Sequence, residues 1–353
     1  MHVGYASIFQ ASADRADNEV YRDELALADL AEPLGFESIW GVEHHFTDYT
    51  MCPDVLQFLT YMAGRTTTAQ LGSMVVVLPW HDPIRVAEQV SMLDALSGGR
   101  MIFGMGRGLG QVEFGGFRVP MDESRERFVE AAELILAGLE NGYVKYEGQF
   151  FSQPEREIRP RPFKSFKGRT YAAAVSPESS KIMAELGVGI LIIPQKPWDS
   201  MMAELDTYKD IFREVNGVEA PPTATAGWVF CDEDADRAKE MAKKYIGGYY
   251  ESVLEHYQLA GDHFAKTKGY EYYGGMSKML NKHGDQAGID FFVDLQVYGT
   301  PDQCFEKVMD VRSMVNAESM VAVCSYADMP MDEAERNLRL FAEKVKPRLQ
   351  AVT

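Results

Sequence analysis

The amino-acid sequence predicts an α/β fold, namely one (β/α)₈ TIM barrel that spans residues 1–353 as a single domain. Short runs rich in Val, Ile and Phe alternate with longer amphipathic stretches, which is typical of βα units around a parallel sheet. The runs number about eight, and eight strands close a barrel of this kind. The predicted strands are His2–Phe9, Phe36–Val42, Gln70–Leu78, Met101–Gly106, Thr170–Val175, Gly189–Ile193, Thr223–Phe230 and Ser319–Ser325.

Helix boundaries between these runs are marked by characteristic residues. Asp82-Pro83 places an N-cap and a first-turn proline before one amphipathic stretch, and Gly98-Gly99 ends that stretch. The segment Thr300–Gln303 has the T-x-x-Q pattern of a capping box. Residues Asp122–Leu139 and Asp234–Tyr257 are predicted to form longer helices of the outer ring.

Two insertions interrupt the alternation, at about residues 141–167 and 259–296. The first contains Tyr143–Phe151, which is predicted to form a small β-hairpin. The second precedes the last strand and is long, aromatic and rich in glycine. Loops of this length in a compact domain are usually functional or disordered. We therefore expect residues 259–296 to be a mobile lid.

Charge and cysteine usage exclude several classes of protein. A formal net charge of −18 argues against a nucleic-acid partner, because binding a polyanion requires a basic face. No apolar run approaches the roughly 20 residues that cross a bilayer, and the N-terminus lacks a signal-peptide pattern. The four cysteines form no CxxC pair, so we expect no zinc site or disulfide framework and a cytoplasmic location.

Polar residues follow the second predicted strand, where barrels of this class place their active sites. Glu43, His44 and His45 stand directly after that strand. A histidine at a strand end can act as a general acid or base near neutral pH. The alternative is that one histidine is hydrogen-bonded in the core while the other is exposed. No H-E-x-x-H or comparable spacing is present, so no metal site is expected.

A glycine-rich segment, Gly104–Gly110, follows the fourth predicted strand. Its glycine spacing does not match the G-x-G-x-x-G dinucleotide fingerprint. The glycines are interpreted as allowing the backbone to approach a large flat ligand, with Arg107 binding a phosphate. The alternative is a glycine-rich turn that carries a surface arginine.

The fifth predicted strand leads into a possible phosphate site. Ser176 fits an N-cap position and Pro177 the first helical position, with Ser179 two residues later. A helix N-terminus with free N–H groups and hydroxyls favours a phosphate, although an ordinary cap has the same pattern. Trp80, His81 and Glu113 fall near the same rim and are expected either to line the pocket or to close it.

Several separated motifs, taken in order, resemble the bacterial luciferase-like family of flavin-dependent monooxygenases, and most closely its α subunit. The resemblance runs nearly from end to end of the chain. The matching segments are Trp40–Thr47, Val77–Pro79, His81–Arg85, Asp94–Arg100, Phe103–Leu109, Gly248–Ser252 and Thr267–Tyr270. Several motifs in the right order are more specific than any one of them.

The resemblance implies that reduced FMN reacts with O₂ to give a flavin C4a-peroxide, which transfers one oxygen atom to a small organic substrate. It also implies a homodimer that packs through the helices after the second and third strands. No nicotinamide fingerprint is present, so we expect a separate NAD(P)H:flavin reductase to supply the reduced flavin.

The same resemblance assigns roles to individual residues. His44 would be the catalytic acid/base, and a non-prolyl cis peptide would join Met74 to Val75 beneath the flavin. The cofactor-binding residues would be Met74, Val75, Gly106, Arg107, Leu109, Val175, Ser176 and Ser179. The substrate pocket or lid would include Glu43, His45, His81, Glu113, Lys268, Gly269 and Tyr270.

Three departures from the family pattern leave the organic substrate and light emission unassigned. Gly106 stands where the α subunit has a reactive cysteine, Val175 replaces an acidic residue, and Glu113 replaces an aspartate. Two alternatives within the family are a deazaflavin (F420)-dependent hydride-transfer enzyme and a non-catalytic flavin-binding subunit. The mobile lid argues against the first, and His44 together with the lid argues against the second. Outside the family, the alternative is a metal-dependent barrel hydrolase.

Overall fold

The computed structural model describes residues 1–10, 14–173 and 177–352. Within these residues, eight parallel strands close into a barrel, in the order β12-β1-β2-β3-β5-β8-β9-β10, because β10 pairs with both β9 and β12. A short strand, β4 (Val76–Val77), continues the line of β3 and pairs with β5. The barrel strands are β1 (His2–Ser7), β2 (Ser38–Gly41), β3 (Gln70–Ser73), β5 (Met101–Gly106), β8 (Thr170–Ala173), β9 (Gly189–Ile192), β10 (Thr223–Cys231) and β12 (Ala317–Val323).

This arrangement confirms the predicted fold class, and each predicted strand corresponds to one barrel strand. All residues of β5 and β10 are buried, as expected for parallel strands that are covered on both faces. The boundaries differ most in Gln70–Leu78, which is divided into β3 and β4. The division lies at the Met74–Val75 peptide bond, which is cis.

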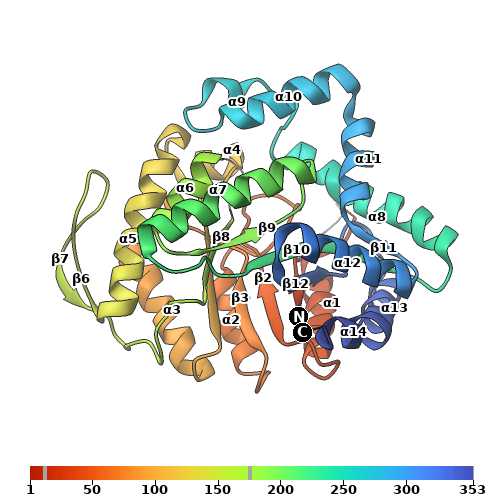
Figure 1. The fold of residues 1–353 in the computed structure, drawn as a ribbon, viewed down its shortest axis with the longest axis horizontal. Coiled ribbons are helices and arrows are strands. Elements are labelled where there is room, and N and C mark those ends of the chain that lie inside the picture. Colours follow the sequence, from red (N-terminus) through yellow and green to blue (C-terminus); the bar gives the residue numbers. More distant parts are fainter. Residues whose placement is uncertain (11–13, 174–176, 353) are drawn as a thin grey trace.

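Helices surround the barrel (Figure 1). Their caps follow the predicted signals: the Asp82 carboxylate accepts from the backbone N–H groups of Ile84 and Arg85, and Thr300 and Gln303 form a capping box. The helices outside residues 259–296 are α1 (Asp17–Ala31), α2 (Val55–Ala63), α3 (Pro83–Ser97), α4 (Gln111–Phe117), α5 (Ser124–Asn141), α6 (Pro177–Glu185), α7 (Trp198–Asn216), α8 (Ala235–His256), α12 (Pro301–Val315), α13 (Met331–Leu340) and α14 (Lys346–Gln350), with short turns η1 (Leu78–Trp80), η2 (Met121–Glu123) and η3 (Phe341–Val345).

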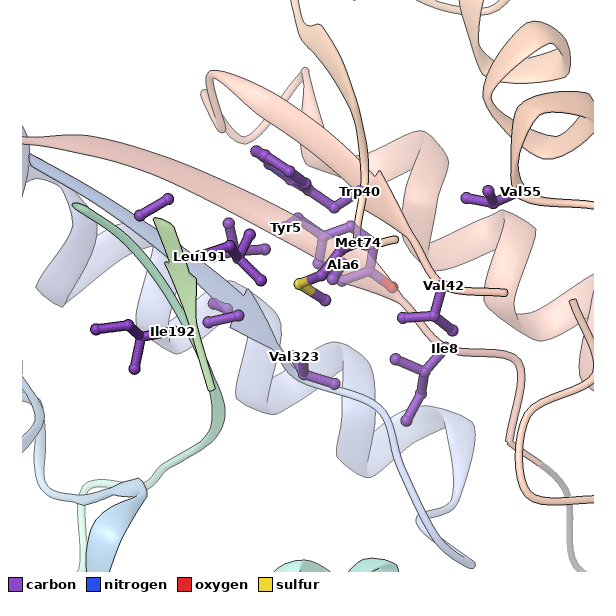
Figure 2. Packing of buried hydrophobic residues seen from close by; sticks show 14 of the residues in the cluster. Tyr5, Ala6, Ile8, Trp40, Val42, Val55, Met74, Leu191, Ile192 and Val323 are labelled. Carbon is purple, nitrogen blue, oxygen red and sulfur yellow. The ribbon is translucent and has the colours of Figure 1, made fainter. Parts of the chain in front are cut away.

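Trp40 is the largest of the fully buried side chains and packs among the barrel strands (Figure 2). Its indole N–H donates to Ser38 Oγ at 2.8 Å. A Cβ atom on Gly72 would lie 2.3 Å from the Trp40 ring, and one on Gly4 would lie 2.9 Å from Trp40 Nε1. Glycine at these two strand positions therefore makes room for the indole, which fills this part of the barrel.

The two insertions differ in structure. The first forms the predicted hairpin, with β6 (Tyr143–Glu147) antiparallel to β7 (Ser152–Glu157), and it extends away from the barrel (Figure 1). The second, which we call the lid segment (residues 259–296), lies over one end of the barrel. It contains α9 (His263–Lys266), α10 (Glu271–His283) and α11 (Asp285–Leu295), and β11 (Val297–Gly299) follows it and pairs with β10.

The prediction of a loop at residues 259–296 was therefore wrong in its secondary structure. Gly274 and Gly275, which suggested a loop, lie inside α10. A Cβ atom on Gly274 would lie 3.0 Å from Ala265 Cα, so this glycine allows α10 to pack closely against α9. The glycine at position 274 is therefore explained by close packing of the two helices rather than by a flexible backbone.

All four cysteines, Cys52, Cys231, Cys304 and Cys324, are buried free thiols. Across the described part of the chain, no helix is both long and apolar enough to cross a bilayer.

Candidate active site

A cavity of about 210 Å³ lies at the C-terminal ends of the barrel strands, where active sites of this fold occur. Nine of the predicted residues line it: Glu43, His44, Met74, Val75, Gly106, Arg107, Leu109, Glu113 and Ser179. Five predicted residues do not line it: His45, His81, Lys268, Gly269 and Tyr270. Val175 and Ser176 lie outside the described residues.

One side of the cavity carries His44 and Glu113, which we call the acid–base pair. His44 Nδ1 lies 3.0 Å from Glu113 Oε1, and the same oxygen accepts the backbone N–H of His45 at 2.9 Å. Glu113 lies in the first turn of α4, where the helix dipole favours a negative charge. Burial alone would raise the pKa of Glu113, but the nearby His44 and His256 lower it to about 2. The carboxylate is therefore ionised and can only accept hydrogen bonds, so His44 Nδ1 carries the proton.

Glu43 borders the cavity as expected, and its carboxylate also connects neighbouring elements of the barrel. Its carboxylate accepts from His45 Nε2 at 3.1 Å, His81 Nε2 at 2.7 Å, Trp80 Nε1 at 2.8 Å and the backbone N–H of Val77 at 2.9 Å. Burial would raise the pKa of Glu43, but these hydrogen bonds, led by those from His45 and His81, lower it to about 2. Glu43 thus joins β2 to β4 and η1.

Of the two adjacent histidines, one therefore has the environment of a core residue and the other that of an acid or base. His45 is buried and hydrogen-bonded to Glu43, as in the core alternative. His44 is partly exposed to the cavity, as expected for an acid or base. His81 and Trp80 close the rim behind Glu43 and do not line the cavity.

The glycines at the end of β5 allow neighbouring segments of the backbone to approach each other closely. A Cβ atom on Gly104 would lie 1.8 Å from the Ser73 carbonyl oxygen, and one on Gly106 would lie 2.3 Å from a Val75 methyl group. The two glycines therefore allow β3, the cis peptide and β4 to pack against β5. The sequence interpretation named a flat ligand as the group approached, whereas the structure shows the neighbouring strand.

Arg107 and Arg125, which we call the arginine pair, lie at another part of the cavity wall. Arg107 Nη1 donates to the Gly269 carbonyl oxygen at 2.8 Å, and Arg125 Nη2 donates to the same oxygen at 3.2 Å. The Arg107 guanidinium lies 4.0 Å from the centre of the Tyr270 ring. Two cationic groups thus converge on one partially negative oxygen of the lid segment.

Two further contacts fasten the lid segment at this point. The Tyr270 hydroxyl donates to the Gly108 carbonyl at 2.8 Å, and Lys268 forms an ion pair with Glu126. Lys268, Gly269 and Tyr270 therefore contact the residues around the predicted phosphate arginine rather than the cavity itself.

Sequence reasoning missed Arg125. This residue stands in the first turn of α5, where the helix dipole disfavours a positive charge. An arginine at a helix N-terminus is unfavourable without an anionic partner, and that signal could have identified it. In the structure Arg125 also pairs with Glu178 Oε2 at 2.6 Å.

Aromatic residues on β10, α8 and α11, also missed, form an apolar wall of the cavity. Trp228 packs on Tyr249 with ring centres 4.2 Å apart, and Tyr250 stacks on Phe292 at 4.4 Å. Tyr257 completes the wall beside His44, with its hydroxyl 3.4 Å from His44 Nε2. Burial raises the pKa of Tyr249 and Tyr257, so both hydroxyls remain protonated near neutral pH.

A possible metal-binding arrangement is also present among the described residues. One donor atom from each of His44, Glu113 and His256 lies within 4.8 Å of the others. His256 Nε2 is 3.7 Å from Glu113 Oε2, which is beyond hydrogen-bonding distance.

The sequence model of the luciferase-like monooxygenases matches residues 1–317. The chain belongs to the luciferase-like monooxygenase family. Its curated relatives include the alkanal monooxygenase alpha chain of Photorhabdus luminescens, which is 25% identical over 341 residues and covers 95% of this chain and 94% of the relative. The alkanal monooxygenase alpha chain of Aliivibrio fischeri is 27% identical over 326 residues, or 90% of each chain.

Several solved structures share the fold of this chain. Monooxygenase RslO1 from Streptomyces bottropensis aligns with a TM-score of 0.83 at 24% identity and 99% coverage of both chains. The oxygenating constituent of 3,6-diketocamphane monooxygenase from Pseudomonas putida, in complex with FMN, gives 0.76 at 17% identity and 99% coverage of both chains. An F420-dependent secondary alcohol dehydrogenase gives 0.73 at 15% identity and 98% coverage of both chains.

Proposed function

We propose that this chain is a monooxygenase that uses reduced FMN and O₂ to insert one oxygen atom into a small organic substrate. A separate NAD(P)H:flavin reductase would supply the reduced flavin. The observation that carries the proposal is the cavity itself, which is lined by both the acid–base pair and the arginine pair at the mouth of a luciferase-like barrel.

The residues around the cavity fit FMN. Two guanidinium groups that already converge on an oxygen atom are suited to a phosphate dianion, and the Ser179 side chain lines the same cavity. Met74, Val75 and Leu109 offer a largely apolar surface for a flat ring system. Arg107, Arg125 and Ser179 would therefore hold the phosphate, and these apolar residues would contact the rings. When bound, reduced FMN supplies the electrons that activate O₂.

The protein contributes a proton site that faces the cavity. Because Glu113 holds His44 by Nδ1, the remaining nitrogen, Nε2, is the atom that can accept or release a proton. The Tyr257 hydroxyl lies 3.4 Å from this nitrogen and restricts its orientation. His44 would thus act as the acid/base of the reaction.

The aromatic wall would exclude water and bind the organic substrate. Trp228, Tyr249 and Phe292 present large apolar surfaces to the cavity. Exclusion of water protects reactive oxygen species from hydrolysis and unproductive decay. The lid segment contributes to the same wall through Leu259, Tyr273 and Phe292.

An isotope experiment tests the proposal. The protein is titrated anaerobically with reduced FMN and then mixed with ¹⁸O₂ and a panel of organic substrates, and the products are analysed by mass spectrometry. We expect one ¹⁸O atom in the product and no steady oxidation of NADH by the protein alone. Steady NADH oxidation would contradict the requirement for a separate reductase.

A second candidate function is F420-dependent hydride transfer, which the fold of the F420-dependent neighbour favours. The two cofactors are distinguished by a parallel incubation with F420 under nitrogen. Substrate turnover with F420 and no ¹⁸O incorporation with FMN would establish hydride transfer and exclude the monooxygenase reaction.

We also propose that the chain forms a homodimer through α2 and α3. Tyr61 on α2 and Met92 and Leu96 on α3 are large hydrophobic residues with 49%, 52% and 58% of their surface exposed. The double substitution Met92→Glu and Leu96→Glu is expected to convert the dimer to a monomer in analytical ultracentrifugation. Val215→Glu with Val218→Glu, near the end of α7, is the matched control. A monomeric native protein would contradict the proposal.

A further inference from the structure

Two consecutive residues, His256 and Tyr257, contact the acid–base pair from opposite ends. They stand at the C-terminal end of α8, directly before the lid segment. Tyr257 places its hydroxyl 3.4 Å from His44 Nε2, whereas His256 places its Nε2 3.7 Å from Glu113 Oε2. The end of α8 therefore bounds both the nitrogen of His44 that faces the cavity and the oxygen of Glu113 that faces away from His44.

His256 is held rigidly although it does not line the cavity. Its ring stacks on Tyr49 with centres 4.6 Å apart, and its Nδ1 lies 2.8 Å from Thr47 Oγ1. Its edges face His44 at 5.3 Å and Tyr257 at 4.8 Å between ring centres. Only 1% of the His256 side chain is exposed.

One atom of this buried ring lacks a partner. Among the described residues, His256 Nε2 has no hydrogen-bond partner. A buried polar atom without a partner is costly, so its position calls for an explanation. The nearest acceptor is Glu113 Oε2, because Oε1 already accepts from His44 and from the backbone of His45.

The contact with Thr47 is compatible with a ring proton on either nitrogen of His256, because either group can donate. If the Thr47 hydroxyl donates to Nδ1, the ring proton resides on Nε2 and points toward Glu113. Burial lowers the pKa of His256, so the ring is neutral near pH 7 and adds no second positive charge beside His44. A neutral N–H group then faces an ionised carboxylate across 3.7 Å.

We propose that His256 is a positioning residue for His44. Its Nε2–H group, oriented by Thr47, faces the Glu113 carboxylate and attracts it electrostatically across 3.7 Å without a hydrogen bond. This attraction favours the carboxylate orientation that keeps the His44 Nδ1 proton in place and directs Nε2 into the cavity. Tyr257 restrains the opposite nitrogen of His44. Because both residues directly precede the lid segment, a movement of the lid at this point changes the setting of the acid–base pair. The inference rests on the proposed acid–base role of His44.

Three variants test the role of His256. His256→Phe retains a stacked ring without the N–H group, and His256→Gln restores an N–H donor near the position of Nε2. Thr47→Val removes the orienting hydroxyl without altering His256. Tyr245→Phe, on the same helix but away from the cavity, is the control. Each variant is examined by ¹⁵N NMR of its histidine rings, with His44 assigned from His44→Gln, and by the pH dependence of turnover.

We expect His256→Phe to raise the pH at which the His44 ring resonances titrate by about half a pH unit, because a less satisfied Glu113 carboxylate attracts protonated His44 more strongly. The limb of the pH–rate profile that reports His44 should move by the same amount. Thr47→Val should shift both in the same direction. His256→Gln should restore most of the native behaviour, and Tyr245→Phe should change neither.

Two results would overturn the proposal. One is an unchanged His44 titration and pH profile in His256→Phe and Thr47→Val, even if turnover falls. The other is stoichiometric binding of Zn²⁺ by the native protein that His256→Gln abolishes, because the unpaired nitrogen would then be a metal ligand. The NMR titration requires no turnover, so the proposal for His256 and the monooxygenase proposal can fail independently.

Discussion

The acid–base pair and the arginine pair belong to the same cavity, but they are held in different ways. His44 and Glu113 are fixed by hydrogen bonds between barrel elements, and Glu113 is almost completely buried. Arg107 and Arg125 are fixed by a carbonyl oxygen of the lid segment, next to an exposed ion pair between Lys268 and Glu126. The first arrangement is built into the barrel, whereas under the proposed function an anionic ligand would replace the carbonyl oxygen in the second.

Under the proposed function, this difference would separate two tasks of the cavity. A proton-transferring group must keep its geometry through every turnover, which favours support from rigid strands. A phosphate-binding group must release its ligand, and a neutral carbonyl satisfies the guanidinium donors in the meantime. A phosphate dianion accepts stronger hydrogen bonds than a carbonyl and is expected to displace Gly269 from the arginine pair.

The largest expected effect concerns the acid–base pair. His44→Ala should lower the rate of oxygen transfer by about 10²- to 10⁴-fold, the usual contribution of a general acid or base. Binding of reduced FMN should be unaffected, because the arginine pair is intact. The measurements are product formation and an anaerobic flavin titration. Unchanged oxygen transfer in His44→Ala would show that His44 is not the acid/base of the reaction.

The hydrogen bonds to the Glu43 carboxylate should make the free energy of unfolding depend on pH in the acid range. The pKa of Glu43 is about 2 in the folded protein against 4.5 for the unperturbed group. The ionised carboxylate therefore stabilises the fold above about pH 4.5, and this contribution, about 3 kcal/mol, is lost as pH falls toward 2. Glu43→Gln should lower the free energy of unfolding at pH 7 and flatten its decline below pH 4.5.

Urea denaturation at a series of pH values measures this effect. Glu155→Gln, an exposed position on the hairpin, is the control and should follow the native curve. A native-like acid dependence in Glu43→Gln would mean that Glu43 does not hold β2, β4 and η1 together.

Substitutions in the arginine pair should change the affinity for reduced FMN rather than the rate of the chemical step. Arg107→Ala or Arg125→Ala should weaken binding of reduced FMN by about 10- to 100-fold, because a charged hydrogen bond contributes about 1.5–3 kcal/mol. Riboflavin, which lacks the phosphate, should bind all forms equally. Arg118→Ala, an exposed arginine at the end of α4, is the control. Equal weakening of FMN and riboflavin would contradict a phosphate-specific role.

The smallest expected effect concerns the contact of the lid segment. Tyr270→Phe removes the hydrogen bond to the Gly108 carbonyl and retains the ring under Arg107. Loss of one such bond should increase the population of the open lid by about 5-fold. Limited proteolysis within the lid segment should accelerate by the same factor. Tyr272→Phe, which is exposed on α10, should leave the rate unchanged.

The comparison also shows where sequence reasoning succeeds. The strands, the caps at Asp82 and Thr300 and the position of His44 were predicted because each depends on a short stretch of chain. The Met74–Val75 cis peptide was predicted through the family resemblance and is confirmed. The hairpin at β6 and β7 likewise follows from local alternation.

Residues that act through distant contacts were missed or misinterpreted. Arg125 joins Arg107 only because α5 begins beside the end of β5, and His256 approaches Glu113 only because α8 crosses the barrel mouth. Glu43 lines the pocket as predicted, but its hydrogen bonds to β4 and η1 were not foreseen. Gly274 was interpreted as a loop residue because the close approach of Ala265 is not encoded locally.

The buried cysteines make it possible to measure the opening of the barrel separately from the opening of the lid segment. Cys231 lies on β10 and Cys304 on α12, whereas Cys52 precedes α2 and Cys324 follows β12, so none of the four thiols is in the lid segment. Burial raises the pKa of the Cys52 and Cys324 thiols, which further suppresses their reaction with thiol reagents. Labelling by such a reagent therefore records the opening of buried positions outside the lid segment. The labelling rate measures how often the barrel opens, and the rate of proteolytic cleavage in the lid segment, taken under the same conditions, measures how often the lid opens. The two rates can therefore be determined independently.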